Sequence, residues 1–118
     1  MMKRFKHPLE GFRRLLIKDI HFLLHVITSI IVLIISVIFK LNSVEWLLII
    51  SAIFLVLITE ALNTAIEEVV DLTTNEYNLH AKYAKDVASF AVLLSSLYAM
   101  IIGVIIFLPK ILKLLGVF

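Results

Sequence analysis

Cysteine is absent from this chain of 118 residues, and charged side chains make up only 17% of it. Without cysteine the chain forms no disulfide and offers no thiolate to a metal ion. So little charge, combined with 62% hydrophobic residues and a mean hydropathy of +1.09, lies far outside the composition of water-soluble domains. The chain is therefore expected to lie in a lipid bilayer, and nucleic acid is not expected among its partners.

Three apolar stretches have the roughly 20-residue length that a helix needs to cross the hydrocarbon core. They cover residues 22–39, 46–66 and 87–108. The second stretch is preceded by Asn42 and Ser43, which are typical of a turn and helix N-cap, and it continues as a polar helix to about residue 72. We predict an all-α membrane protein with three transmembrane helices in a single domain, residues 1–118.

The segment before the first span, residues 1–20, is predicted to form an amphipathic helix on the membrane surface. Its apolar residues recur at helical spacing, as Phe5, Leu9, Phe12 and Leu16. The segment has no small-residue cleavage site, so a removable signal peptide is not expected. The sequence leaves open whether this helix only anchors the protein to anionic lipid or also takes part in an active site.

Basic residues before the first span predict that the N-terminus is cytoplasmic. They are Lys3, Arg4, Lys6, Arg13, Arg14 and Lys18. Three spans then place residues 71–86 on the cytoplasmic side as well.

One face of the second predicted helix carries four polar residues, here called the acid stripe: Glu60, Asn63, Glu67 and Asp71. Spacings of three, seven and eleven residues return to nearly the same side of an α-helix at about 100° per residue. Ionisable side chains at membrane depth are costly, so they are candidate functional residues by default.

The two ends of the acid stripe suit different tasks. Glu67 and Asp71 lie near the membrane surface, where like charges need a counter-ion, and Mg²⁺ held by one or two carboxylates and phosphate oxygens is one answer. Asp19 is a candidate second carboxylate from another element. Glu60 lies about 10 Å deeper than Glu67, where a lipid hydroxyl lies, so Glu60 is a candidate general base.

Positive charge for a polyphosphate is available from Lys85, from Arg13 or Arg14, and from Lys6. Metal, cations and a positioned base are what phosphoryl transfer needs. No Gly-x-x-x-x-Gly-Lys loop is present, so a nucleotide site here is of another kind. The spacing alone favours a lipid-phosphorylating enzyme and a proton-coupled transporter equally.

The acid stripe belongs to the ungapped block Glu60-Ala-Leu-Asn63-Thr64-Ala65-Ile66-Glu67-x-Val69-Val70-Asp71. Further along are Glu76-Tyr77 and Ala84-Lys85-Asp86-x-Ala88. These blocks closely resemble the signature of the prokaryotic diacylglycerol kinase family, and the resemblance extends from about Phe5 to Pro109. It implies a homotrimeric three-span kinase of the bacterial plasma membrane that uses Mg²⁺ and ATP to phosphorylate a lipid alcohol, with active sites shared between neighbouring subunits.

The resemblance also implies residue roles. Glu60 would be the general base, while Glu67 and Asp19 would hold the metal ion. The residues that would contact the nucleotide or order its site are Asn63, Glu67, Asp71, Glu76, Tyr77, Lys85 and Asp86, with Lys6 and Arg13 as further candidates.

Two branches of the family differ in their lipid, and the segment Ser43-x-Glu45-Trp46 and the ending Ile106-Phe107-Leu108-Pro109-Lys110 look more like the undecaprenol kinases than the diacylglycerol kinases. Undecaprenol is therefore the expected acceptor, with diacylglycerol as the alternative.

Three positions depart from the family pattern: Asp19 replaces a longer Glu, Leu23 replaces a charged residue, and Phe90 replaces a small one. The pattern assigns no role to the histidines His21, His25 and His80.

Overall fold

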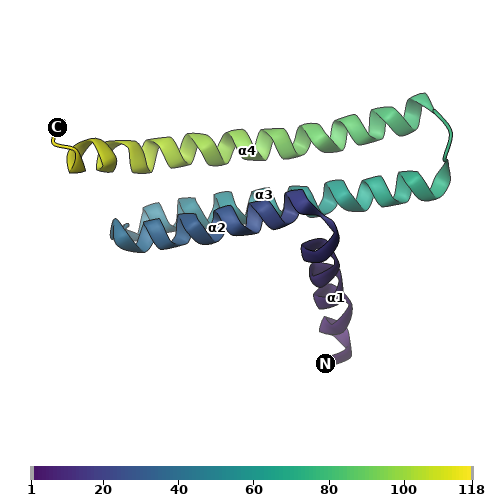
Figure 1. The fold of residues 1–118 in the computed structure, drawn as a ribbon, viewed down its shortest axis with the longest axis horizontal. Coiled ribbons are helices and arrows are strands. Elements are labelled where there is room, and N and C mark those ends of the chain that lie inside the picture. Colours follow the sequence, from purple (N-terminus) through teal and green to yellow (C-terminus); the bar gives the residue numbers. More distant parts are fainter. Residues whose placement is uncertain (1, 118) are drawn as a thin grey trace.

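The computed structural model describes residues 2–117, which form four helices (Figure 1). Their bounds are α1 Met2–Lys18, α2 Ile20–Ile38, α3 Ser43–Thr73 and α4 Leu79–Leu114. The predicted all-α class is confirmed, and α2, α3 and α4 are long and apolar enough to cross a membrane. At 1.5 Å per residue, the 31 residues of α3 span roughly 46 Å, which exceeds the ~30 Å hydrocarbon core. The helix therefore extends beyond the lipid interior.

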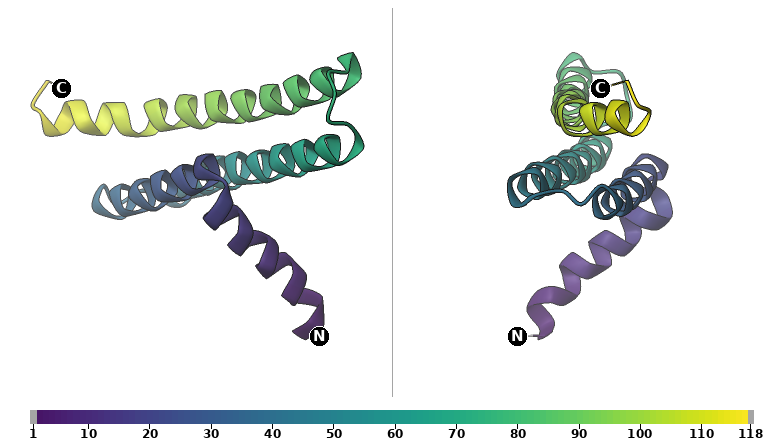
Figure 2. Two further views of the ribbon diagram at one scale, coloured as in Figure 1. Left: turned by 45° about the vertical axis from the view of Figure 1, so that its right-hand side comes forward. Right: turned by 90° about the vertical axis from the view of Figure 1, so that its left-hand side faces the viewer.

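The long helices form a small bundle, from which α1 projects (Figures 1 and 2). α3 and α4 run antiparallel and form the most extensive helix pair, while α2 packs beside α3. α1 turns away from the bundle at the start of α2, where Phe12 and Phe22 meet edge to face with ring centroids 6.0 Å apart. α1 thus reaches the bundle through its C-terminal end.

Side-chain caps explain where the long helices begin. Asn42 caps α3 in a capping box, since it accepts from the Glu45 N–H and the Glu45 carboxylate accepts from the Asn42 N–H. Asn78 caps α4 by accepting from the His80 and Ala81 N–H groups. α4 therefore begins at Leu79, well before residue 87, because its first turns form in the polar segment ahead of the apolar stretch.

The apolar core lies at the end of the bundle where α2 joins α3. Its buried members are Leu41, Ile49, Ala52, Ile102 and Ile106. At the same end, the Lys110 ammonium and the Glu45 carboxylate form an ion pair of 3.1 Å between α4 and α3. Polar contacts continue along these two helices, with a hydroxyl–hydroxyl distance of 2.7 Å between Thr59 and Ser95. Apolar packing and polar pairs thus fix α4 against α3.

We predict that Ile106→Ala destabilises the protein in detergent by about 2 kcal/mol or more, because it removes packed atoms from the core. Ile106 is 5% exposed, whereas its neighbour Ile105 is 66% exposed. Ile105→Ala is the matched control and should change the free energy of unfolding by about 0.5 kcal/mol or less. Reversible unfolding followed by circular dichroism measures both. Equal destabilisation by the two variants would contradict the core assignment.

Candidate active site

Three members of the acid stripe line one cavity between α2, α3 and α4. Glu60, Asn63 and Glu67 form one wall of this cavity of about 300 Å³. The facing residues are His21, His25, Ser89 and Val92. The Asn63 side-chain amide donates a hydrogen bond of 3.2 Å to the Glu67 carboxylate. The predicted helical spacing therefore brings these three side chains together.

Glu60 is the buried member of the acid stripe. Only 5% of it is exposed, although the large majority of charged residues in proteins are exposed. Asp19, at the junction of α1 and α2, lines one cavity together with Glu60. A buried position is costly for an ionisable side chain, which makes Glu60 a candidate functional residue.

Asp19 connects the start of α2 to α3. Its Oδ1 accepts hydrogen bonds from the His21 N–H at 3.0 Å and the Phe22 N–H at 3.2 Å, which caps α2. Its Oδ2 accepts a hydrogen bond of 2.6 Å from the Thr64 hydroxyl. Burial raises the pKa of the Asp19 carboxyl, but the hydrogen bonds from Thr64 and the backbone outweigh it, so this pKa lies below its usual range. Asp19 is held as an anion.

A larger cavity of about 750 Å³ lies around Asp19. Glu60, Asn63 and Glu67 line this cavity as well, so they contact both spaces. α1 contributes to the lining with Gly11, Arg14, Leu15 and Lys18. The C-terminal part of α1 thus brings two positive charges to the carboxylates.

The donors around this cavity fit a magnesium ion. Glu67 and Asp19 both line it, and Mg²⁺ is usually bound by one or two carboxylates together with waters and phosphate oxygens. The Asn63 Oδ1 is buried without a hydrogen-bond partner, which leaves a further oxygen donor beside Glu67. Among residues 2–117, no cluster of three or more metal-ligating side chains occurs. Glu67 and Asp19 are thus two carboxylates of this cavity that would be able to hold the ion.

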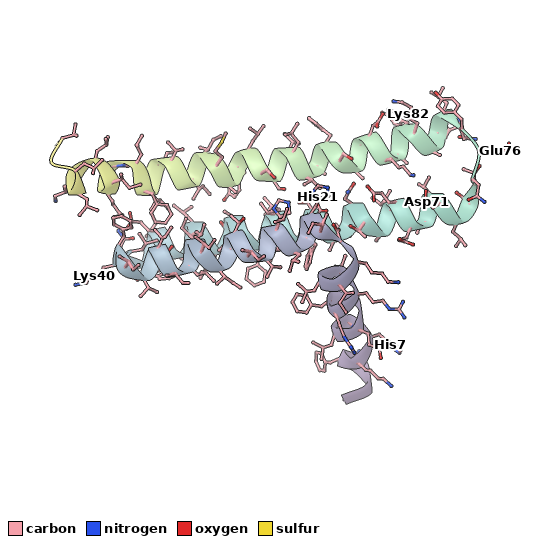
Figure 3. The ribbon with its side chains drawn as sticks, in the orientation of Figure 1. His7, His21, Lys40, Asp71, Glu76 and Lys82 are labelled. Atoms are coloured by element: carbon pink, nitrogen blue, oxygen red, sulfur yellow. The ribbon has the colours of Figure 1, made fainter. Side chains whose placement is uncertain are left out.

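A third cavity, of about 540 Å³, lies where α3 turns into α4. Five predicted nucleotide residues line it: Asp71, Glu76, Tyr77, Lys85 and Asp86. Figure 3 shows Asp71, Glu76 and Lys82 together at this end of the α3–α4 pair, whereas His21 lies farther along the bundle. The Lys85 ammonium contacts the Asp71 carboxylate at 2.7 Å, and the Lys82 ammonium contacts Asp86 at the same distance. Two lysine–aspartate ion pairs thus line this cavity.

The predicted residues on α1 occupy a different position. Lys6 and Arg13 are absent from the residues that line the three polar cavities, whereas Arg14 and Lys18 line the one around Asp19. Sequence reasoning did not select Lys18, His21 or Thr64 as site residues. Gly11, Arg14 and Lys18 share one helical face by their spacing, and this spacing could have identified the side of α1 that faces the cavity around Asp19.

A fourth cavity, of about 280 Å³, extends from His25 toward the apolar core between α2, α3 and α4. Apolar and small residues dominate its lining, including Ala52, Val56, Ala99 and Gly103. Because His25 also lines the cavity of Glu60, the two spaces are neighbours. Phe90 is exposed and lies outside the linings of all four cavities.

These features define a helical membrane protein with acid-rich cavities at one end of its spanning helices. The family described as prokaryotic diacylglycerol kinase matches residues 6–107, and the chain belongs to this family of lipid kinases. This membership decides against the transporter alternative. The chain is 38% identical over 108 residues to an undecaprenol kinase of Bacillus subtilis (strain 168). The aligned residues make up 92% of this chain and 88% of that protein.

Two diacylglycerol kinases are also similar to the chain. The protein from Synechocystis sp. is 34% identical over 116 residues, covering 98% of this chain and 66% of that protein. The protein from Escherichia coli (strain K12) is 32% identical over 101 residues, covering 86% of this chain and 83% of that protein.

We predict that the charge of Asp19 stabilises the fold at neutral pH. Its pKa is lower in the folded protein, so the stabilisation is present above the unfolded value of about 3.9 and is lost as the pH falls through the folded value. Asp19→Asn keeps a good N-cap but lacks the charge. Thermal unfolding should show the wild type more stable at about pH 7, with the difference shrinking below about pH 4. A difference that stayed constant on acidification would contradict this assignment.

Proposed function

We propose that this lipid kinase transfers the γ-phosphoryl group of ATP to the hydroxyl of undecaprenol, forming undecaprenyl phosphate and ADP. The observation that carries the proposal is the buried Glu60 on a membrane-spanning helix, in a cavity that it shares with Asn63 and Glu67. A lipid hydroxyl approaching from the bilayer and a phosphate approaching from water meet at such a position.

Glu60 acts as the general base. Its carboxylate accepts the proton of the lipid hydroxyl while the lipid oxygen bonds to the γ-phosphorus and the bond from that phosphorus to the β-phosphate oxygen breaks. Burial matters because a carboxylate shielded from water is a more effective proton acceptor than a fully hydrated one. Glu60 then releases its proton to solvent, which resets the site.

Glu67 and Asp19 would hold Mg²⁺, with the free Asn63 oxygen beside them. When bound there, Mg²⁺ would supply positive charge that offsets the negative charge of the transferring phosphate. Asn63 orients Glu67 through its side-chain amide. Asn63 and Glu67 lie about one and two helical turns after the base on the same face of α3, and Asp19 comes from the junction of α1 and α2.

The nucleotide occupies the cavity at the α3–α4 turn. Lys85 leaves Asp71 to pair with the phosphates, while Glu76 and Tyr77 lie near the adenosine. Asp71 and Asp86 order the lysines of this cavity. Arg14 and Lys18 add positive charge from α1, on which Lys6 and Arg13 are further candidate phosphate contacts.

Two observations support undecaprenol as the acceptor. A relative with 38% identity over most of the chain is named an undecaprenol kinase. In addition, the segment Ser43-x-Glu45-Trp46 and the ending Ile106-Phe107-Leu108-Pro109-Lys110 look more like the undecaprenol kinases. With either lipid, the apolar cavity beside His25 has room for the part of the chain next to a hydroxyl at Glu60. Diacylglycerol is the alternative acceptor, since relatives at 34% and 32% identity carry that name.

We further propose that the protein acts as a homotrimer with shared active sites in the bacterial plasma membrane. The site and the N-terminus face the cytoplasm, and α1 lies on the membrane surface with its apolar residues in the lipid. The support is the large number of exposed apolar side chains on all four helices, because a membrane or another copy of the chain covers such surfaces. Exposed Phe5, Leu9 and Phe12 on α1 belong to this set.

We predict that purified protein in detergent, with Mg²⁺ and radiolabelled ATP, labels undecaprenol faster than diacylglycerol. The two lipids are compared in one assay at equal mole fraction in the micelle. Faster labelling of diacylglycerol would assign the alternative acceptor. Failure to label either lipid would contradict the proposed function.

We predict that Glu60→Gln lowers turnover by roughly 100-fold or more, because the amide cannot accept the proton. The variant should retain its helix content, since Gln has nearly the same size. Glu10→Gln is the matched control, because Glu10 is exposed on α1 and outside the cavity linings. Normal turnover in Glu60→Gln would remove Glu60 as the base.

A further inference from the structure

The hydroxyl of Thr64 differs in its bonding from other hydroxyls of the long helices. Thr28, Ser36 and Thr73 donate to carbonyl groups of their own helices, which is common for Ser and Thr in helices. Thr64 instead donates to Asp19, 45 residues earlier in the chain. The distance of 2.6 Å is typical of a hydrogen bond from a hydroxyl to an ionised carboxylate.

This hydrogen bond limits the freedom of the Asp19 side chain. A carboxylate has about four acceptor sites, and the Thr64 hydroxyl with the His21 and Phe22 N–H groups fills three of them. The remaining capacity is available to the cavity that Asp19 lines together with Glu60 and Glu67. Thr64 itself is β-branched, so its χ1 angle is restricted within α3. The bonds therefore fix both oxygens of Asp19 relative to the acid stripe.

We propose that Thr64 is a positioning residue, which holds the Asp19 carboxylate against the acid stripe in the orientation that binds the divalent cation. This proposal rests on the proposed function, in which Asp19 and Glu67 hold Mg²⁺. Thr64 lies four residues after Glu60 and three before Glu67, so it connects Asp19 to the same two turns of α3. A hydrogen-bond donor to a ligating carboxylate commonly changes metal affinity by about 10- to 100-fold when it is removed.

Three variants test this role. Thr64→Val keeps the shape of the side chain and removes the hydroxyl, while Thr64→Ser keeps the hydroxyl and removes the methyl group. Ser51→Ala is the control for general loss of an interhelical hydroxyl contact, because Ser51 faces the Tyr98 hydroxyl at 3.2 Å on the far side of Glu60 from Thr64. Circular dichroism and thermal unfolding in detergent establish that each variant is folded.

The first measurement is binding of Mn²⁺ alone, followed by the electron paramagnetic resonance signal of the free ion as protein in detergent is added. We expect Thr64→Val to weaken binding by about tenfold or more, and Thr64→Ser and Ser51→Ala to stay within about twofold of the wild type. Wild-type Mn²⁺ affinity in folded Thr64→Val would overturn the proposal. An equal loss of affinity in folded Thr64→Ser would also overturn it, because the hydroxyl would then not be the determinant.

The second measurement is the Mg²⁺ concentration that gives half-maximal lipid phosphorylation. It should rise by about tenfold in Thr64→Val while the maximal rate changes less, because the added cation compensates for the misplaced ligand. A fall in maximal rate with an unchanged Mg²⁺ requirement would overturn the proposal. If the wild type phosphorylates neither lipid, the proposed function fails, whereas the Mn²⁺ titration still decides the role of Thr64.

Discussion

The cost of burying a carboxyl group within a membrane-spanning helix shapes this protein. Glu60 is 5% exposed, and a group of this kind is stable only where other polar groups of the protein contact it. Asp19 lines one cavity together with Glu60, and Asp19 is in turn held by Thr64 and by the first N–H groups of α2. The hydrogen bond from Thr64 therefore ties the junction of α1 and α2 to α3 beside the acid stripe.

The apolar and polar parts of the bundle are separated along its length. The buried apolar residues gather near Ile49 and Ile102, where α2 joins α3, and the ion pair of Glu45 with Lys110 lies at the same end. The cavities lined by acids lie at the other end. The main cluster of buried apolar residues thus packs on one half of α3, and the acidic residues that would weaken an apolar core lie in the other half.

Helical periodicity and capping chemistry were enough to predict the all-α class, the acid stripe and the Asn42 cap, because each depends on residues close together in the sequence. Other features depend on tertiary contacts. The rotation of α1, which brings Arg14 rather than Arg13 to the cavity around Asp19, accompanies the packing of Phe12 on Phe22. The hydroxyl of Thr64 turns to Asp19 only because α2 begins beside α3, and no local pattern encodes that neighbour.

The connection between α3 and α4 has a consequence for size. Its five residues, Thr74 to Asn78, all line the cavity proposed for the nucleotide, so the connection is itself a wall of that cavity. Thr73 and Leu79, the ends of the two helices, are six residues apart and so can separate by at most about 21 Å when the connection is fully extended. The length of the connection therefore limits the width of the cavity that it lines.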